Sequence, residues 1–92
     1  MKDMRLCLIE WVDSAGGGGW QNIDKAKSDA AENELRCETA GWLLERTDRY
    51  VLVATSRTVG RSEDDQVGDP MQIPAACVTR IRTLDQGSTL RR

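Results

Sequence analysis

Short apolar segments separated by polar or glycine-rich stretches dominate this chain, and this pattern favours β-strands over helices. Residues 4–12 (MRLCLIEWV) form a β-rich segment that stops at Asp13 and Ser14. Residues 35–46 (LRCETAGWLLER) alternate with a period of two until Gly41 interrupts them. Because a glycine inside a strand pattern indicates a bend or a bulge, we expect the second strand to be bent.

The second half of the chain continues this pattern. Residues 50–56 (YVLVATS) form the most β-like segment, and the short connection at 47–49 predicts a hairpin with the strand before it. Residues 57–70 are polar, with two glycines and a proline, and predict a long exposed loop. Pro74 suits the first position of a helical turn but not a central strand. The remaining expected elements are a strand at 71–73, one helical turn at 74–76 and a last strand at 77–84.

One segment, residues 22–34, has the composition of a helix. It is polar and alanine-rich, and either Asn22 or Asp24 can serve as its N-cap. Its apolar stripe consists only of Ile23 and two alanines. We therefore expect a short helix on the surface.

The order of these elements predicts a mainly β fold. Five short strands, with a bent second strand and one helical turn before the fifth, are the order of a small SH3-like or Sm-like barrel, whose closure would remove exposed sheet edges. A ferredoxin-like sandwich is the alternative, but it needs two substantial amphipathic helices and the sequence offers at most one. We expect a single small β-barrel domain over residues 1–86, the surface helix in its first long loop, and a flexible tail at 87–92.

Composition narrows the possible functions. A chain of 92 residues without Phe has a small core, so self-association into a homo-oligomer would help to stabilise it. The net charge of −2 argues against a non-specific nucleic-acid binder. No signal peptide or membrane span is visible in the sequence. Cys7, Cys37 and Cys77 lie far apart in apolar stretches, which predicts small buried side chains in a reduced cytoplasm.

Groups suited to catalysis or metal binding are scarce. The chain has no histidine, so Ser-His pairs, Cys-His pairs and the usual zinc sites cannot form. The glycine run at 16–19 lacks the G-K-[ST] and G-x-G-x-x-G patterns of nucleotide-binding loops. Glu63, Asp64 and Asp65 could hold Mg²⁺ together with water, but adjacent acids on a loop are usually only solvated. We expect no enzyme, no cofactor and no metal site.

The unusual residues gather in two of the predicted loops. Trp11 and Trp20 flank the glycine run, and an exposed indole offers a face on which a base can stack. The long loop carries Arg57 and Arg61, whose guanidinium groups match phosphate oxygens. If the loops meet at one end of the barrel or across a subunit boundary, they enclose an anion site; otherwise these residues are solvated charges and barrel plugs. The candidate ligand-binding residues are Trp11, Gly18, Gly19, Trp20, Gln21, Lys25, Arg57, Arg61 and Gln66.

Several short motifs resemble a group of small proteins encoded by bacteriophages and prophages. They are W-V-D-S…G-G-W, E-T-A-G-W-L-L, D-R-Y-V-L-V-A-T-S, Q-V-G and I-P-A-A-C-V-T-R-I-R-T-L, spread over roughly residues 6–84. The resemblance implies an SH3-like or Sm-like barrel that acts in the cytoplasm of the infected bacterial host. The RNA site of Sm proteins is not carried over, because residues 47–49 match only its aspartate and residues 73–76 lack its Arg-Gly pair.

Two classes of function follow. The first is a phage accessory protein that, without chemistry, binds and sequesters a small anionic nucleotide, in particular a host immune signal, and so counters antiviral defence. The second is a protein-binding phage module that inhibits a host defence factor; an Sm-like RNA-binding module is a weaker third. No membrane partner is expected, and nucleic acid is disfavoured. The acidic face of the second class would consist of Asp24, Asp29, Glu32, Glu34 and Glu38, which imitate a phosphate backbone.

Overall fold

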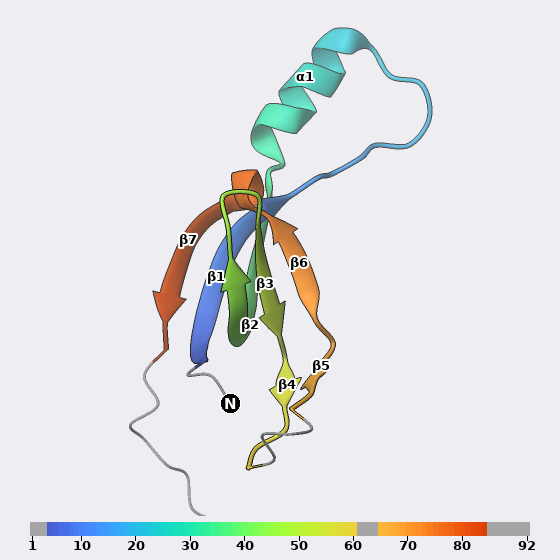
Figure 1. The fold of residues 1–92 in the computed structure, drawn as a ribbon. Helices are drawn as coiled ribbons and strands as arrows, with labels where there is room; N and C mark the ends of the chain where they lie inside the picture. Colours follow the sequence, from blue (N-terminus) through green and yellow to red (C-terminus); the bar gives the residue numbers. More distant parts are fainter. Residues whose placement is uncertain (1–3, 61–64, 85–92) are drawn as a thin grey trace, which may run out of the picture.

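The computed structural model describes residues 4–60 and 65–84, and it shows the mainly β fold that the sequence predicts. Both ends of the expected domain and the 87–92 tail lie outside this range. Figure 1 shows the elements in chain order. They are β1 (Arg5–Asp13), α1 (Ile23–Glu32), β2 (Leu35–Arg46), β3 (Tyr50–Ala54), β4 (Ser56–Arg57), β5 (Val67–Gly68), β6 (Met71–Pro74), the 3₁₀ turn η2 (Ala75–Cys77) and β7 (Val78–Thr83).

Five of the strands form one antiparallel sheet in the order β6-β3-β2-β1-β7. The β2–β3 hairpin is confirmed: its turn is held by the hydroxyl of Thr47, which accepts hydrogen bonds from the backbone N–H groups of Arg49 and Tyr50 at 3.1 Å. In the described residues no pairing joins the two edge strands, β6 and β7, to each other. Closure into a barrel is therefore not found.

The second strand bends sharply, as the glycine in its pattern predicts. Figure 1 shows β2 folding back so that its first half lies along β1 and its second half along β3. A side chain at Gly41 would place its Cβ 2.6 Å from the carbonyl oxygen of Ala54 and 2.7 Å from Cγ2 of Val53. A shift in register between Leu43 and Glu45 adds a bulge next to this point. The bend thus depends on a residue without a side chain.

The bend creates the core. Ile9 of β1 packs against Val51 and Val53 of β3 and Ile73 of β6, and all four side chains are at most 2% exposed. Because β1 is not a neighbour of β3 or β6 in the sheet, this contact requires the sheet to fold over itself. The core is small, and partly buried side chains extend it: Trp11, Leu43, Cys77, Val78 and Ile81.

Two expectations need correction. The segment 57–70 is not wholly a loop, because β4 and β5 pair as a second small sheet. Thr58 extends this hairpin, with its N–H donating to the Gln66 carbonyl at 2.9 Å and its hydroxyl accepting from the Gln66 N–H at 3.0 Å. Polar composition concealed a strand pair that is held by backbone hydrogen bonds.

The second correction concerns the three cysteines, which the sequence predicts to be buried. All three are free thiols, but only Cys7 is buried, whereas Cys37 and Cys77 are half-buried.

Candidate functional site

Residues 14–34, which connect β1 to β2 and which we call the β1–β2 arm, contain a helix that is stabilised locally. The side-chain oxygen of Asn22 caps α1 by accepting from the N–H groups of Asp24 at 2.9 Å and Lys25 at 3.3 Å. Lys25 pairs with Asp29 one turn later at 2.8 Å. None of the residues of α1 is buried, and Figure 1 shows the helix standing away from the sheet. The sheet therefore contributes little to the packing of this helix.

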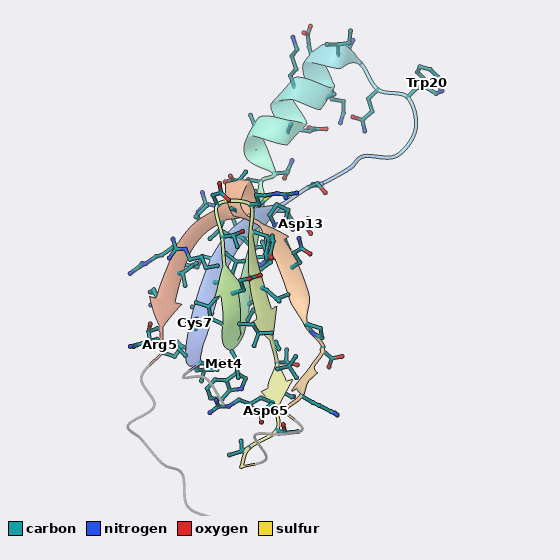
Figure 2. The ribbon with its side chains drawn as sticks, viewed as in Figure 1. Met4, Arg5, Cys7, Asp13, Trp20 and Asp65 are labelled. Carbon is teal, nitrogen blue, oxygen red and sulfur yellow. The ribbon has the colours of Figure 1, made fainter. Side chains whose placement is uncertain are left out.

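The tip of the arm exposes large apolar side chains. Trp20 is 104% exposed relative to its reference area, and Ile23, the first residue of α1, is 71% exposed. Figure 2 shows the indole of Trp20 at the outer side of the loop, pointing away from the helix. Gly19, just before it, has a φ of 70°, a conformation that favours glycine. The loop thus presents its tryptophan to the surroundings rather than burying it.

The glycine loop and α1 enclose a pocket of about 330 Å³. Gly17 allows the loop to approach Gln21, because a Cβ there would lie 2.7 Å from the side-chain nitrogen of Gln21. The pocket offers little to an anion: the first amides of the helix already bind Asn22, and the only charged lining residue is Asp29. It is lined by Ala15, Gly16, Gly17, Gln21, Ala26, Asp29, Ala30 and Asn33, so Gly18 and Gly19 do not line it.

The predicted arginine loop lies at the other end of the molecule. Arg57 of β4 stacks on Trp42 of β2, with 3.9 Å between its guanidinium carbon and the ring centroid. Gln66 is exposed beside β5, and Arg61 lies outside the described residues. Figure 2 shows Trp20 and Asp65, a neighbour of Gln66, at opposite ends of the molecule. Within one chain, therefore, the described parts of the two loops do not meet at one end of the fold, and of the two arrangements that the sequence left open only a site across a subunit boundary remains.

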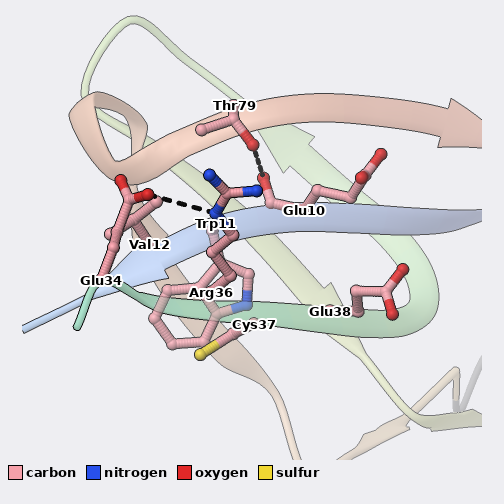
Figure 3. A pocket seen from close by; sticks show the side chains of 8 residues that line it. All are labelled: Glu10, Trp11, Val12, Glu34, Arg36, Cys37, Glu38 and Thr79. Carbon is pink, nitrogen blue, oxygen red and sulfur yellow. Dashed lines mark hydrogen bonds and ion pairs between the residues drawn. The ribbon is translucent and has the colours of Figure 1, made fainter. Parts of the chain in front are cut away.

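Trp11, the remaining predicted site residue, lies at the root of the arm. Its indole N–H donates to the hydroxyl of Thr39 at 3.0 Å, and its ring packs against the core. It also lines a pocket of about 480 Å³, which we call the root pocket and which Figure 3 shows from close by. The lining residues are Glu10, Trp11, Val12, Glu34, Arg36, Cys37, Glu38 and Thr79.

Sequence reasoning missed the root pocket and the Trp42–Arg57 stack. The available signal for the pocket was the alternation of the first two strands, which puts Glu10 and Glu38 on one face of the sheet once their register is known. The register between β1 and β2 is set only when the two strands pair in the folded sheet, so local composition does not reveal it. For the stack there was no local signal, since Trp42 and Arg57 belong to different strands.

A shifted ionisation equilibrium occurs away from these sites. The phenol of Tyr50 hydrogen-bonds to the carboxylate of Glu45, which raises the pKa of Tyr50, and partial desolvation raises it further. The pair joins the start of β3 to β2. It lines neither the pocket between the glycine loop and α1 nor the root pocket.

Neither a metal-binding cluster nor a membrane-spanning helix is found among the described residues, and the comparisons with known proteins find no match. Within residues 4–60 and 65–84, no three or more Cys, Asp or Glu side chains gather in a way that could hold a metal ion. Over the same residues, no helix has the length and apolar character needed to cross a membrane. Comparison of the chain with protein-family models, curated proteins and solved structures finds no match.

Proposed function

We propose that this protein is a non-catalytic, protein-binding module and that the β1–β2 arm is its binding element. The observation that carries the proposal is the fully exposed indole of Trp20 at the tip of a folded arm whose helix buries no residue. Exposed large apolar side chains mark interaction sites, and tryptophan is enriched among the anchors of protein interfaces. The sheet then serves as the scaffold from which the arm projects.

The charge of the arm and its root indicates the kind of partner. Residues 10–38 contain seven acidic and three basic residues, although the whole chain carries a net charge of only −2. In the described structure, Asp24, Glu32 and Glu38 form no ion pair. A basic protein surface complements this arrangement, and complementary charge speeds association. In the phage setting that the sequence motifs resemble, the partner would be a host defence factor in the cytoplasm.

Replacing Trp20 with alanine should weaken capture of the partner by about 30-fold, because loss of a central tryptophan anchor costs about 2 kcal/mol or more. Tagged wild-type and W20A proteins would be compared for the proteins that they retain from a bacterial host lysate. The principal retained protein would then be purified and its Kd measured for both variants. Since Trp20 packs against nothing, the variant should unfold at the same temperature as the wild type.

A matched control is Val59→Ala, which removes a 76% exposed apolar side chain just after β4 rather than on the arm. This variant should bind the purified partner as the wild type does. Equal binding by W20A, V59A and the wild type would contradict the proposed role of the arm.

Reversing two charges of α1 together, by Asp24→Lys with Glu32→Lys, should slow association with the partner and reduce the dependence of the association rate on salt.

Capture of a small anionic nucleotide is the second candidate function. It is supported by the stacked guanidinium of Arg57, which is held in place by Trp42, and by the exposed indole of Trp20, on which a base can stack. Trp20 (Figure 2) and β4, which carries Arg57 (Figure 1), lie at opposite ends of the molecule, so such a site needs two copies of the chain arranged head to tail. A homo-oligomer is thus part of this proposal.

The strand order and the η2 turn before β7 support an SH3-like or Sm-like barrel as the underlying fold.

A thermal-shift screen against cyclic di- and trinucleotides and ADP-ribose derivatives tests the second function. A bound nucleotide should raise the melting temperature by several degrees, and both W20A and Arg57→Ala should remove the rise. A flat response to every nucleotide would reject this candidate. It would leave the proposal of a protein partner unaffected.

A further inference from the structure

We propose that the edge strand β7 binds an extended, acidic segment of a protein partner, which adds to the sheet as an antiparallel strand. This surface lies on the sheet rather than on the β1–β2 arm, so the inference goes beyond the proposed function. Three features of β7 support it: an open backbone edge, two exposed arginines on one face, and a partly apolar pocket beside the other face. A strand in which acidic and apolar residues alternate fits all three.

The backbone edge of β7 is open. Among the described residues β7 pairs with β1 on one side, and no strand pairs with it on the other side, at the left of the sheet in Figure 1. The N–H of Leu84 donates to the carbonyl of Leu6 at 2.8 Å. Because hydrogen-bonded pairs alternate along antiparallel strands, the backbone groups of Arg82 also point toward β1, whereas those of Ile81 and Thr83 point away from it. These outward groups are the donors and acceptors that an added strand would engage.

The opposite edge of the sheet is less suited to pairing. β6 has four residues, compared with six in β7, and it ends at Pro74, which has no N–H to donate. β7 contains neither proline nor glycine. We therefore assign the addition of a strand to β7 rather than to β6.

Two arginines give this edge a positive charge. Arg80 lies directly opposite Glu10, and Arg82, two residues further along β7, lies on the same face of the sheet. Their Nε atoms are 3.8 and 3.6 Å from Oε2 of Glu10, and their side chains are 64% and 45% exposed. Two guanidinium groups share this one carboxylate oxygen and together carry one positive charge more than it neutralises. An acidic side chain from outside complements that charge.

The geometry of an added antiparallel strand would place its side chains opposite these arginines. Ile81 and Thr83 would form the hydrogen-bonded pairs with it. The residues opposite Arg80 and Arg82 would therefore lie in non-hydrogen-bonded pairs, in which the side chains approach more closely. Opposite charges in directly opposed positions stabilise a sheet. Glutamate or aspartate at these two positions of the added strand consequently suits β7.

A second copy of β7 does not fit the same edge. Pairing Ile81 with Ile81 of the second copy would place Arg80 opposite Arg82, and pairing Ile81 with Thr83 would place Arg82 opposite Arg82. Like charges in directly opposed positions destabilise a sheet. Charged side chains on an edge strand also hinder edge-to-edge pairing between copies of one chain. The charge of β7 thus favours an acidic partner over self-association.

The other face of β7 adjoins a pocket of about 260 Å³ between this strand and the β2–β3 turn. Ile81 lies opposite Ile9 and therefore faces the core side of the sheet, where it lines the pocket together with Val51 and Val78. The other lining residues are Arg46, Thr47, Asp48 and Ala75. The residue of an added strand opposite Ile81 would point to this face, next to the pocket. An apolar side chain there would cover the half-buried Ile81.

Titration with a capped peptide in which glutamate and valine alternate, E-V-E-V-E-V-E, tests this inference. At saturation the peptide should slow hydrogen exchange of the backbone amides of Ile81 and Thr83 about tenfold, because they become hydrogen-bonded. The amide of Arg82, which faces β1, should change little. NMR spectra recorded during exchange report on each amide separately. The peptide K-V-K-V-K-V-K, with the opposite charge, should leave all three amides unchanged.

A version of the acidic peptide with N-methylated valines separates strand addition from simple attraction of charge. It keeps every glutamate but loses the N–H groups that would donate to the carbonyls of Ile81 and Thr83. This peptide should bind about tenfold more weakly, because two backbone hydrogen bonds are lost.

Arg80→Gln combined with Arg82→Gln should weaken binding of the E-V peptide about fivefold, because two cross-strand pairs of opposite charge are lost. The matched control is Arg5→Gln combined with Arg36→Gln, which removes the same charge from exposed positions of β1 and β2. This control should bind the peptide as the wild type does. The backbone amide spectrum of each double variant verifies that it is folded.

Equal binding of the acidic peptide and its N-methylated version, or equal binding by the two double variants, would overturn the inference. So would the absence of any change at Ile81 and Thr83 with the E-V peptide. The titration contains no partner of the arm, so its failure is distinguishable from failure of the proposed function. Conversely, W20A should bind the E-V peptide as the wild type does, whatever role the arm has.

Discussion

Replacing Gly41 with alanine should lower the free energy of unfolding by about 2–3 kcal/mol, because an added Cβ overpacks a buried position. The new atom would lie 2.6 Å from the carbonyl oxygen of Ala54 and 2.7 Å from Cγ2 of Val53. The first of these contacts is with backbone, which cannot rotate away. To relieve it, β2 and β3 must separate where the sheet folds back on itself. For a domain of this size the melting temperature should fall by about 8–24 °C.

Denaturant and thermal unfolding of G41A measure this effect, and Gly18→Ala is the control. A Cβ at Gly18 would meet nothing within 4 Å, and its backbone does not require glycine. Alanine there should be neutral or slightly stabilising, because it restricts the unfolded chain. If G41A unfolded at the same temperature as G18A, the close approach of β2 and β3 at this position would be wrong.

Truncating Ile9 to alanine should destabilise the protein by about 3 kcal/mol, since removal of a buried isoleucine costs lost transfer energy and leaves a cavity. Ile9 is 0% exposed and contacts the core residues of β3 and β6. It is the residue of the core cluster that β1 supplies, and within residues 4–60 and 65–84 no aromatic side chain is fully buried. Because the core is small, few other buried contacts remain to offset the loss of the Ile9 side chain.

The same substitution at Ile23 provides the comparison. Ile23 begins α1 and is 71% exposed, so I23A should change the free energy of unfolding by less than about 0.5 kcal/mol. The two variants differ in location rather than in chemistry. Similar losses of stability in both would show that the arm packs against the sheet, contrary to the structure.

Local patterns in the sequence were sufficient for most elements of the fold. The β-rich segment before Asp13, the alternation that Gly41 interrupts, and the N-cap at Asn22 each act over a few neighbouring residues. Their physical causes are equally local: side-chain alternation, backbone freedom at glycine, and a side-chain oxygen that accepts backbone N–H groups. The β4–β5 pair was missed because its bonds join residues far apart along a polar segment.

The candidate sites required the tertiary structure. Sequence proximity suggested that Trp11 and Trp20 flank one site, yet one lies against the core and the other is fully exposed. Trp42 of β2 supports the guanidinium of Arg57 of β4, a contact that no local pattern indicates. The sequence by itself determined the five strands of the main sheet, the surface helix and the shortage of catalytic groups. Only the tertiary structure decided that Glu10 lies opposite Glu38 and that the glycine loop and the arginine loop lie apart. The physical reason is that contacts between distant segments depend on how the strands pair and on how the sheet folds, not on local composition.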